Sequence, residues 1–238
     1  MLTHLRAAAL ILVLLPSVGA ALDFNAGLRA YNAGNYRTAL NEWRPLALQG
    51  NARAQNNLGF MYENGQGVDQ DDAEAVRWYR QAAEQGDAIA QINLGFMYAN
   101  GRGVAQDDAE AVRWYRRAAE QENARAQNNV GFMYENGRGV AQDDAEATRW
   151  YRRAAEQGDA RAQINLGMMY RDLRLPILNA AQSRILAHMW FDIADTNGYR
   201  GAARRRDGVA QDMTSADLTQ AQRLARICME TNYQNCAE

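Results

Sequence analysis

Apolar and polar residues recur along most of the chain with a period of 36 residues. In residues 51–86, the first half of the period carries small and apolar side chains at the spacing of one buried helical stripe: Ala54, Leu58, Met61 and Tyr62. The second half carries another such stripe: Ala75, Tyr79, Ala82 and Ala83, with Trp78 alongside. Each unit is therefore predicted to fold as helix, loop and helix.

Residues that favour helix ends separate the two stripes. The Asn-Gly-Gln-Gly run at 64–67 tolerates positive φ angles, so we expect it to end the first helix and reverse the chain. Asp71, three residues before Glu74, suits an N-cap of the second helix. Gly86 is expected to close that helix in the left-handed conformation, whereas the next unit has Glu122 there. Because a side chain in this conformation is strained, we predict a steric cost at Glu122.

Four such units fill residues 51–198, and their boundaries are predicted at 51–86, 87–122, 123–158 and 159–198. The first and third units match at 31 of 36 positions, and the last has four extra residues with Pro176 between its helices. A single pair of short helices hides too little apolar surface to offset its ordering entropy, so the units must stack. The predicted fold is all-α, a right-handed α-solenoid of stacked helix-loop-helix repeats.

Less regular segments flank the units and are predicted to cap the array. Residues 23–50 keep a helix pair with a tight turn in place of the long loop. Residues 199–238 are predicted to form an Arg-rich helix and a last helix that begins after Thr214. Cys228 and Cys236 form an even pair near the end of a chain that we expect to be exported, so a disulfide is predicted. Two free thiols are the alternative.

The N-terminal residues have the pattern of a secretory leader. Arg6 precedes an apolar run, and Pro16 and small residues follow it, so residues 1–20 are predicted to be a signal peptide. The apolar run is shorter than the ~20 residues that a membrane-spanning helix needs. We therefore expect no membrane span after removal of the leader. Export to the periplasm is predicted, with secretion into the medium as the alternative.

Composition excludes several chemistries. All 26 basic residues are arginine, so Schiff-base lysines, P-loop lysines and Ser-Lys dyads are absent. One of the two histidines, His4, lies in the leader, and His188 alone cannot form a histidine-based metal site. The formal net charge of −2 does not favour a nucleic-acid partner. We expect a binding protein that is not an enzyme and carries no metal or cofactor.

The repeated stretches AQNNLGFMYENGQGV and DDAEAVRWYRQAAEQG resemble the Sel-1-like repeat, a longer-looped relative of the tetratricopeptide repeat. Residues 23–50 resemble a plain tetratricopeptide unit. The resemblance implies an α-solenoid adaptor, and exported bacterial members are implied to modulate envelope enzymes, receptors or host proteins. Some cysteine-rich members are linked to β-lactam binding or hydrolysis, but the regular repeats here contain no cysteine and the chain lacks the S-x-x-K lysine.

Comparison of the repeats with one another separates two kinds of position. Four glutamines are the same in every unit and are predicted to be structural: Gln55, Gln91, Gln127 and Gln163. Positions that vary lie, together with a recurring phenylalanine, on one face of the first helix. In tetratricopeptide arrays, which the chain resembles, this face lines the concave groove. The predicted groove also includes Ile89, Ile92, Ala99, Asn128, Ile164 and Met168.

The predicted partner-binding residues combine rings for apolar anchors with asparagines that could hydrogen-bond an extended peptide. They are Arg53, Asn56, Asn57, Phe60, Glu63, Asn93, Phe96, Arg125, Asn129, Phe132, Glu135, Arg161, Asn165 and Arg171. The alternative is that the rings pack between repeats and the asparagines bond locally. The function predicted is a scaffold that binds a protein or peptide in the cell envelope.

The sequence leaves two other functions open and contains two isolated features with more than one interpretation. The chain could bind or hydrolyse β-lactams or peptidoglycan fragments, as its cysteine-rich relatives suggest, or form a structural part of an envelope assembly. The run Arg204 to Arg206 could be an anion or phospholipid patch, or one solvated helix face. His188 replaces a valine or threonine of the other repeats and is expected to be packed rather than catalytic.

Overall fold

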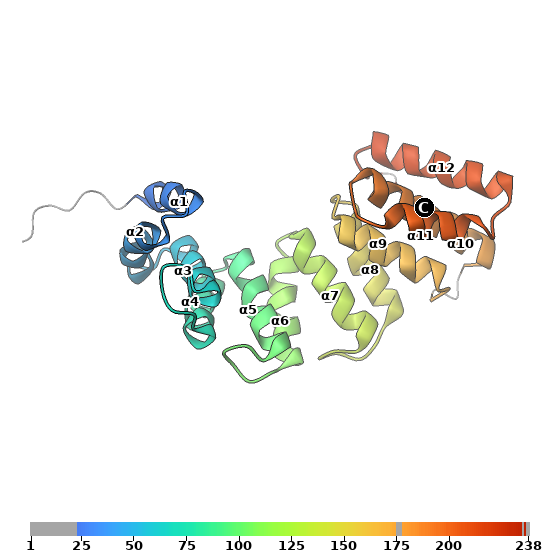
Figure 1. Cartoon of the computed structure of the whole chain (residues 1–238). Coiled ribbons are helices and arrows are strands. Elements are labelled where there is room, and N and C mark those ends of the chain that lie inside the picture. The colour runs from blue at the N-terminus through green and yellow to red at the C-terminus, as the bar shows by residue number, and fades with distance from the viewer. Residues whose placement is uncertain (1–22, 175–177, 235, 237–238) are drawn as a thin grey trace, which may run out of the picture.

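The computed structural model describes residues 23–174, 178–234 and 236, so the predicted leader and Pro176 lie outside the described residues. Within this part twelve helices follow one another in an arc whose two ends rise on the same side (Figure 1). The helices are α1 (Phe24–Asn32), α2 (Tyr36–Leu48), α3 (Ala52–Asn64), α4 (Asp72–Glu84), α5 (Ala88–Asn100), α6 (Asp108–Ala119), α7 (Ala124–Asn136), α8 (Asp144–Ala155), α9 (Ala160–Arg171), α10 (Ala180–Thr196), α11 (Ala202–Ala210) and α12 (Ser215–Glu230). No helix in the described ranges is long and apolar enough to cross a bilayer.

Consecutive helices pack as hairpins, and each hairpin packs on the next, which confirms the all-helical solenoid. Within a hairpin a glycine of the first helix lets an aromatic ring of the second approach its backbone. At Gly59 an added Cβ would lie 2.6 Å from the Tyr79 ring, and Gly167 meets Phe191 in the same way. The buried side chains form a row of clusters along the array instead of one central core. Each repeat is therefore stabilised both by packing within its own hairpin and by its two neighbours.

The helix ends follow the expected chemistry. The Asp71 carboxylate accepts a hydrogen bond of 2.9 Å from the backbone N–H of Glu74, and the same cap recurs in the next two units. Gly65 ends α3 in the left-handed conformation, with φ 65°. Glu122 has φ 61° at the position where Gly86 has φ 92°, so the left-handed conformation predicted for Glu122 is confirmed.

The four glutamines form a buried ladder and are structural, as predicted. Gln91 Nε2 donates to the carbonyl of Ala83 at the end of the preceding hairpin, at 3.1 Å. Its Oε1 accepts a 2.9 Å hydrogen bond from Gln121, which lies at the end of its own hairpin. The same two bonds occur at the other three glutamines, with Asn197 as the donor at Gln163. Each of these carbonyls also accepts a backbone N–H, so the glutamine adds a second hydrogen bond there and links the end of one hairpin to the next.

A second ladder, which the sequence analysis missed, joins each loop to the preceding repeat. Arg102 donates two hydrogen bonds to Asp72, at 3.0 and 2.8 Å, and a third to Glu63 at 2.7 Å. Arg138 binds Asp108 through two nitrogens, and Arg174 reaches Asp144 at 3.1 Å. Gly103 lies against the backbone of Asp72 so closely that a Cβ would collide with it. The loop is therefore held between two successive repeats.

Contacts that do not repeat along the chain stabilise the two ends of the array. At the N-terminus the indole of Trp43 donates to the carbonyl of Phe24, at 3.0 Å. At the C-terminus Cys228 and Cys236 form the predicted disulfide. Thr214 caps α12 reciprocally with Asp217. His188 is 3 % exposed inside α10, which agrees with a packed role, and burial lowers the pKa of its imidazole.

Candidate partner-binding groove

Three phenylalanines form a ladder of half-exposed rings on successive first helices. Phe60, Phe96 and Phe132 are 41 %, 40 % and 43 % exposed, whereas Leu58, Leu94 and Val130, two residues before them, are fully buried. Arg102 lies over the Phe96 ring, 5.8 Å from its centroid, and Phe60 meets the edge of Tyr31. Each ring is therefore partly packed against its neighbours and partly open to solvent.

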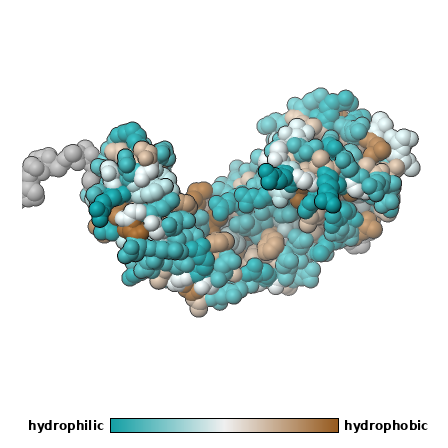
Figure 2. Space-filling model, viewed as in Figure 1, coloured by the Kyte–Doolittle hydropathy of each residue, from teal (hydrophilic) through white to brown (hydrophobic). Residues whose placement is uncertain are grey.

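Residues from five different helices line one cavity at the N-terminal end of this ladder. Its volume is about 340 Å³, and it extends from Leu28 of α1 through Phe60 and Ile89 to Arg125 of α7. Side chains almost one hundred positions apart can share a cavity only where the array curves inward. Figure 2 shows the molecule hollowed between its two ends, with hydrophobic residues gathered near the N-terminal wall of the hollow. The first helices thus line the concave side in this part of the array.

Asparagines lie beside the rings in two arrangements. Asn93 donates to Asn56 at 3.1 Å, and Asn165 donates to Asn128 at 2.9 Å, so each pair joins one repeat to the next. Asn56, Asn57 and Asn93 line the cavity. Asn129 is half-buried on α7 and follows the same register. The pairs hold first helices at a fixed separation, and each amide retains further donor and acceptor capacity.

The two glutamates of the predicted groove each accept a hydrogen bond from a tyrosine of their own hairpin. Glu63 accepts a 2.7 Å hydrogen bond from the hydroxyl of Tyr79 and forms an ion pair with Arg102. Glu135 accepts from Tyr151 at the same distance. Burial, together with the carboxylate, raises the pKa of Tyr79 well above its ordinary value, and likewise that of Tyr151. Tyr115 has Ala99 in place of a glutamate, and burial raises its pKa to about 12.

Four residues of the predicted groove are covered by neighbouring repeats. Ile92 is fully buried, and Ile164, Ala99 and Asn128 are between 2 % and 9 % exposed. Ile92 and Ala99 belong to the cluster between the second and third units. The next hairpin covers one side of this helical face. The sequence of a single helix does not show which side its neighbours will cover. The solvent-exposed part of the predicted groove is therefore narrower than expected.

The predicted arginines are placed at separate points along the array. Arg53 lies over the Phe24 ring, 4.6 Å from its centroid, and Arg125 lines the cavity. Arg161 is exposed at the start of α9. Arg171 forms an ion pair with Asp172 at 2.7 Å and lines a different, C-terminal pocket. Thus Arg53 and Arg125 lie at the N-terminal groove, and Arg171 does not.

Leu28 and Tyr31 were missed as members of the groove. Both belong to α1, in the segment assigned only a capping role, and both line the cavity. Leu28 is 37 % exposed, and Tyr31 donates a hydrogen bond to Gln66 at 2.8 Å. The non-repeating sequence of α1 gave no second copy with which to compare them. Their place in the groove follows from the curvature of the array.

Comparison with known proteins matches four segments of this chain to the Sel1 repeat, at residues 52–87, 88–123, 124–159 and 160–194. A search among curated proteins finds no match. Several solved structures are similar. The uropathogenic Escherichia coli protein c5321, described as a protective antigen displaying an SLR fold, is 34 % identical with a TM-score of 0.72. The match covers 88 % of this chain and 45 % of c5321, so this chain spans less than half of that protein's length.

Two further structures extend the likeness. A Sel1 repeat protein from Oxalobacter formigenes is 30 % identical with a TM-score of 0.63, over 86 % of this chain and 99 % of that protein. A protein from Klebsiella pneumoniae, described as a sel1 repeat protein, is 21 % identical with a TM-score of 0.51, over 79 % of this chain and 91 % of that one. The second likeness concerns the fold alone.

Proposed function

We propose that this chain, which belongs to the Sel1 repeat family, is an exported scaffold that binds a protein or peptide partner in the cell envelope through its concave face. The observation that carries this proposal is the ladder of half-exposed rings at Phe60, Phe96 and Phe132. Apolar rings that stay about two fifths exposed at the same position of three repeats present surface that packing between the repeats leaves uncovered. They are suited to anchor the side chains of a partner.

The groove favours an extended segment with regularly placed apolar residues. Adjacent packed helices lie about 10 Å apart, and a peptide in the polyproline II conformation advances about 3.1 Å per residue and returns to the same face at every third residue. A partner with an apolar side chain at about every third residue would therefore contact successive rings. Asn57 and Asn129 are positioned beside the rings, where their amides could hydrogen-bond the peptide backbone. Arg53 and Arg125 favour acidic residues in the segment that lies near Leu28 and Ile89.

Export is part of the proposal. The leader pattern at residues 1–20 and the pairing of Cys228 with Cys236 both suit an oxidising compartment. The description of c5321 as a protective antigen suits an exported relative. We place the protein in the periplasm, with release into the medium as the second location, and we propose that it acts by binding and not by catalysis. Turnover of nitrocefin by the purified protein above a boiled control would contradict this last point.

Crosslinking in intact cells, followed by identification of the captured proteins, tests the binding proposal. The informative variant is the triple F60A, F96A and F132A, with Leu48→Ala as the matched control. Leu48 is 73 % exposed on α2 and does not line the groove, so its loss removes apolar surface elsewhere. We expect the triple variant to lose its specific crosslinks while L48A retains them. Equal capture by both variants, with both folded, would refute a role for the ladder.

A further inference from the structure

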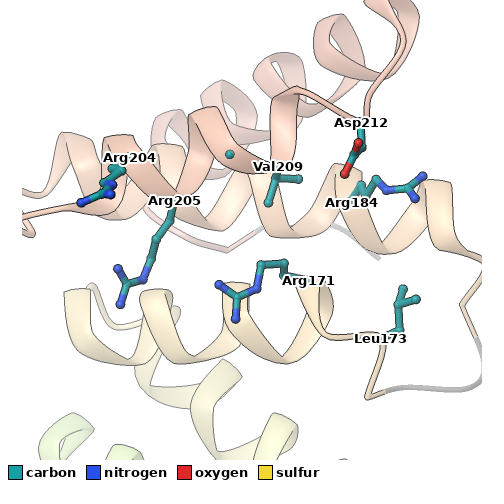
Figure 3. Close-up of a pocket in the computed structure, with 8 residues that line it drawn as sticks. Arg171, Leu173, Arg184, Arg204, Arg205, Val209 and Asp212 are labelled. Carbon is teal, nitrogen blue, oxygen red and sulfur yellow. The ribbon is translucent and has the colours of Figure 1, made fainter.

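The C-terminal end of the array contains a pocket rich in arginine. Its volume is about 510 Å³, and it lies where α9, α10 and α11 meet. Arg171, Arg184, Arg204 and Arg205 line it together with one acidic residue, Asp212. In Figure 3 Arg205 and Arg171 reach into the space between the helices from opposite sides, Val209 faces it, and Arg204 and Arg184 lie at its two ends. Four cations face one anion, so the pocket carries a net positive charge.

Three of these arginines are not neutralised within the part of the chain that the structure describes. Arg171 pairs with Asp172, at 2.7 and 3.0 Å. For Arg184, Arg204 and Arg205, no carboxylate among the described residues lies within ion-pair distance. Arg206, next in the run, differs because it binds Asp192, Asp195 and Asp207. The run is therefore divided between one arginine that holds the fold together and two that line the pocket.

Alignment of the repeats shows how this charge arises. Asn197 ends α10 and donates to Gln163 as Gln85 ends α4 and donates to Gln55, so the two helices are in register. In this register Arg184 occupies the position of Asp72. Gly167 corresponds to Gly59, so Arg171, four residues later, likewise occupies the position of Glu63.

Glu63 and Asp72 are the two carboxylates that hold Arg102 of the following repeat. In the last repeat both carboxylates are replaced by arginines, and the element that follows brings Arg204 and Arg205 to the same side. In the first unit these two positions are carboxylates that bind an arginine. In the last unit the same two positions are positively charged. Another repeat that carried the loop arginine would be repelled there, and an anion would be attracted.

We propose that this pocket binds a ligand that carries a phosphate group. Guanidinium groups match phosphate oxygens with paired hydrogen bonds, and a multiply charged tetrahedral group can accept from several arginines at once. A single carboxylate would leave most of them without a partner. The pocket is larger than inorganic phosphate, and Leu173 and Val209 add an apolar wall, so the ligand has a further part beyond the phosphate. A soluble phosphate ester and the headgroup of an anionic lipid share this chemistry.

Binding of inorganic pyrophosphate, measured by calorimetry in about 20 mM salt, where screening is weak, tests the proposal. We expect R184D and the double variant R204S/R205S to weaken binding at least tenfold. The matched control is R113S/R149S, which removes the same number of charges from exposed arginines paired with Glu110 and Glu146. The control is expected to bind as the parent does. No binding by the parent, or equal binding by R184D, would overturn the proposal.

Stability separates lost binding from lost folding. In phosphate-free buffer R184D should melt close to the parent, because it removes repulsion from Arg204 and Arg205 and adds repulsion from Asp212. Pyrophosphate should raise the melting temperature of the parent and leave that of R184D unchanged. An equal rise in both would contradict the assigned site, and so would melting of R184D far below the parent without phosphate.

Vesicles distinguish the two sources of phosphate. Sedimentation with vesicles of phosphatidylglycerol and phosphatidylcholine, which pyrophosphate reverses, would identify a lipid headgroup. Pyrophosphate binding without vesicle binding would identify a soluble phosphate ester, and either result supports the site. An Asp-rich peptide that binds to the parent while pyrophosphate does not would overturn the proposal in favour of an acidic protein segment. The groove variant F60A/F96A/F132A should retain pyrophosphate binding, so the two proposals fail independently.

Discussion

Arg102 lies across the boundary between two repeats and binds both oxygens of Asp72, thirty positions earlier, at 3.0 and 2.8 Å. The same reach joins Arg138 to Asp108 and Arg174 to Asp144. The pairs are about one third exposed, so each contributes less than a buried ion pair would. Their importance is that they fix the loop of one hairpin to the hairpin before it, beside the glutamine and asparagine contacts between repeats.

Replacing Arg138 with glutamine tests this link. The first unit carries Gln66 at the same position, so the substitution is compatible with the loop. We expect a loss of about 1–2 kcal/mol in the free energy of unfolding, because two charge-assisted hydrogen bonds to Asp108 disappear. Urea unfolding measures this loss. R149Q, which removes an exposed ion pair, should lower the free energy of unfolding by at most a few tenths of a kcal/mol. Equal effects in both would contradict the link.

Glycine at position 122 should stabilise the array. Glu122 has φ 61°, a conformation that is strained for a residue with a side chain and is not strained for glycine. We expect Glu122→Gly to raise the free energy of unfolding by about 0.5–1 kcal/mol. The reverse substitution, Gly86→Glu, should lower it by a similar amount because Gly86 has φ 92°. Thermal melting of the two variants beside the parent would reveal opposite shifts, and identical melting temperatures would contradict the prediction.

The ring ladder should contribute little to stability. Phe96 and Phe132 are about two fifths exposed, so we expect F96A and F132A each to cost about 1 kcal/mol or less. Leu94 lies two residues away and is fully buried, so L94A should cost about 2–5 kcal/mol. Urea unfolding of F96A and L94A makes the comparison within α5, and F132A repeats the ring substitution in α7. A loss at Phe96 as large as that at Leu94 would mean that the rings belong to the core.

Alkaline pH should destabilise the protein through its buried tyrosines. Burial raises the pKa of Tyr115 to about 12, above the ordinary value of 10.0, so the folded protein retains a proton that the unfolded chain releases. Stability from this group is complete below pH 10 and is lost as the pH rises toward 12. We expect Y115F to reduce the slope of this loss by at most about 1.4 kcal/mol per pH unit. A slope identical to that of the parent would argue against a raised pKa at Tyr115.

Local rules read from the sequence account for most of the helical hairpins. The stripe at Ala54, Leu58 and Met61 is buried, and the cap at Asp71 and the left-handed Glu122 occur where the sequence places them. Each depends on residues within one turn or one helix, so no knowledge of distant contacts was needed. The disulfide was also predicted, because the chain offers one cysteine pair.

Only the tertiary structure decided which face of the first helix remains free. Ile92 and Phe96 both lie on the predicted face, yet Ile92 is covered by the next hairpin and Phe96 is not, since the lateral packing of helices is set by neighbours. Curvature brings Leu28 and Arg125 to one cavity, and stacking places Arg184 where a carboxylate stands in earlier units. Periodicity determined the repeat, the helix ends and the buried stripes, because these arise from short-range geometry. The groove and the basic pocket arise from the sum of small rotations between repeats, which no single repeat encodes.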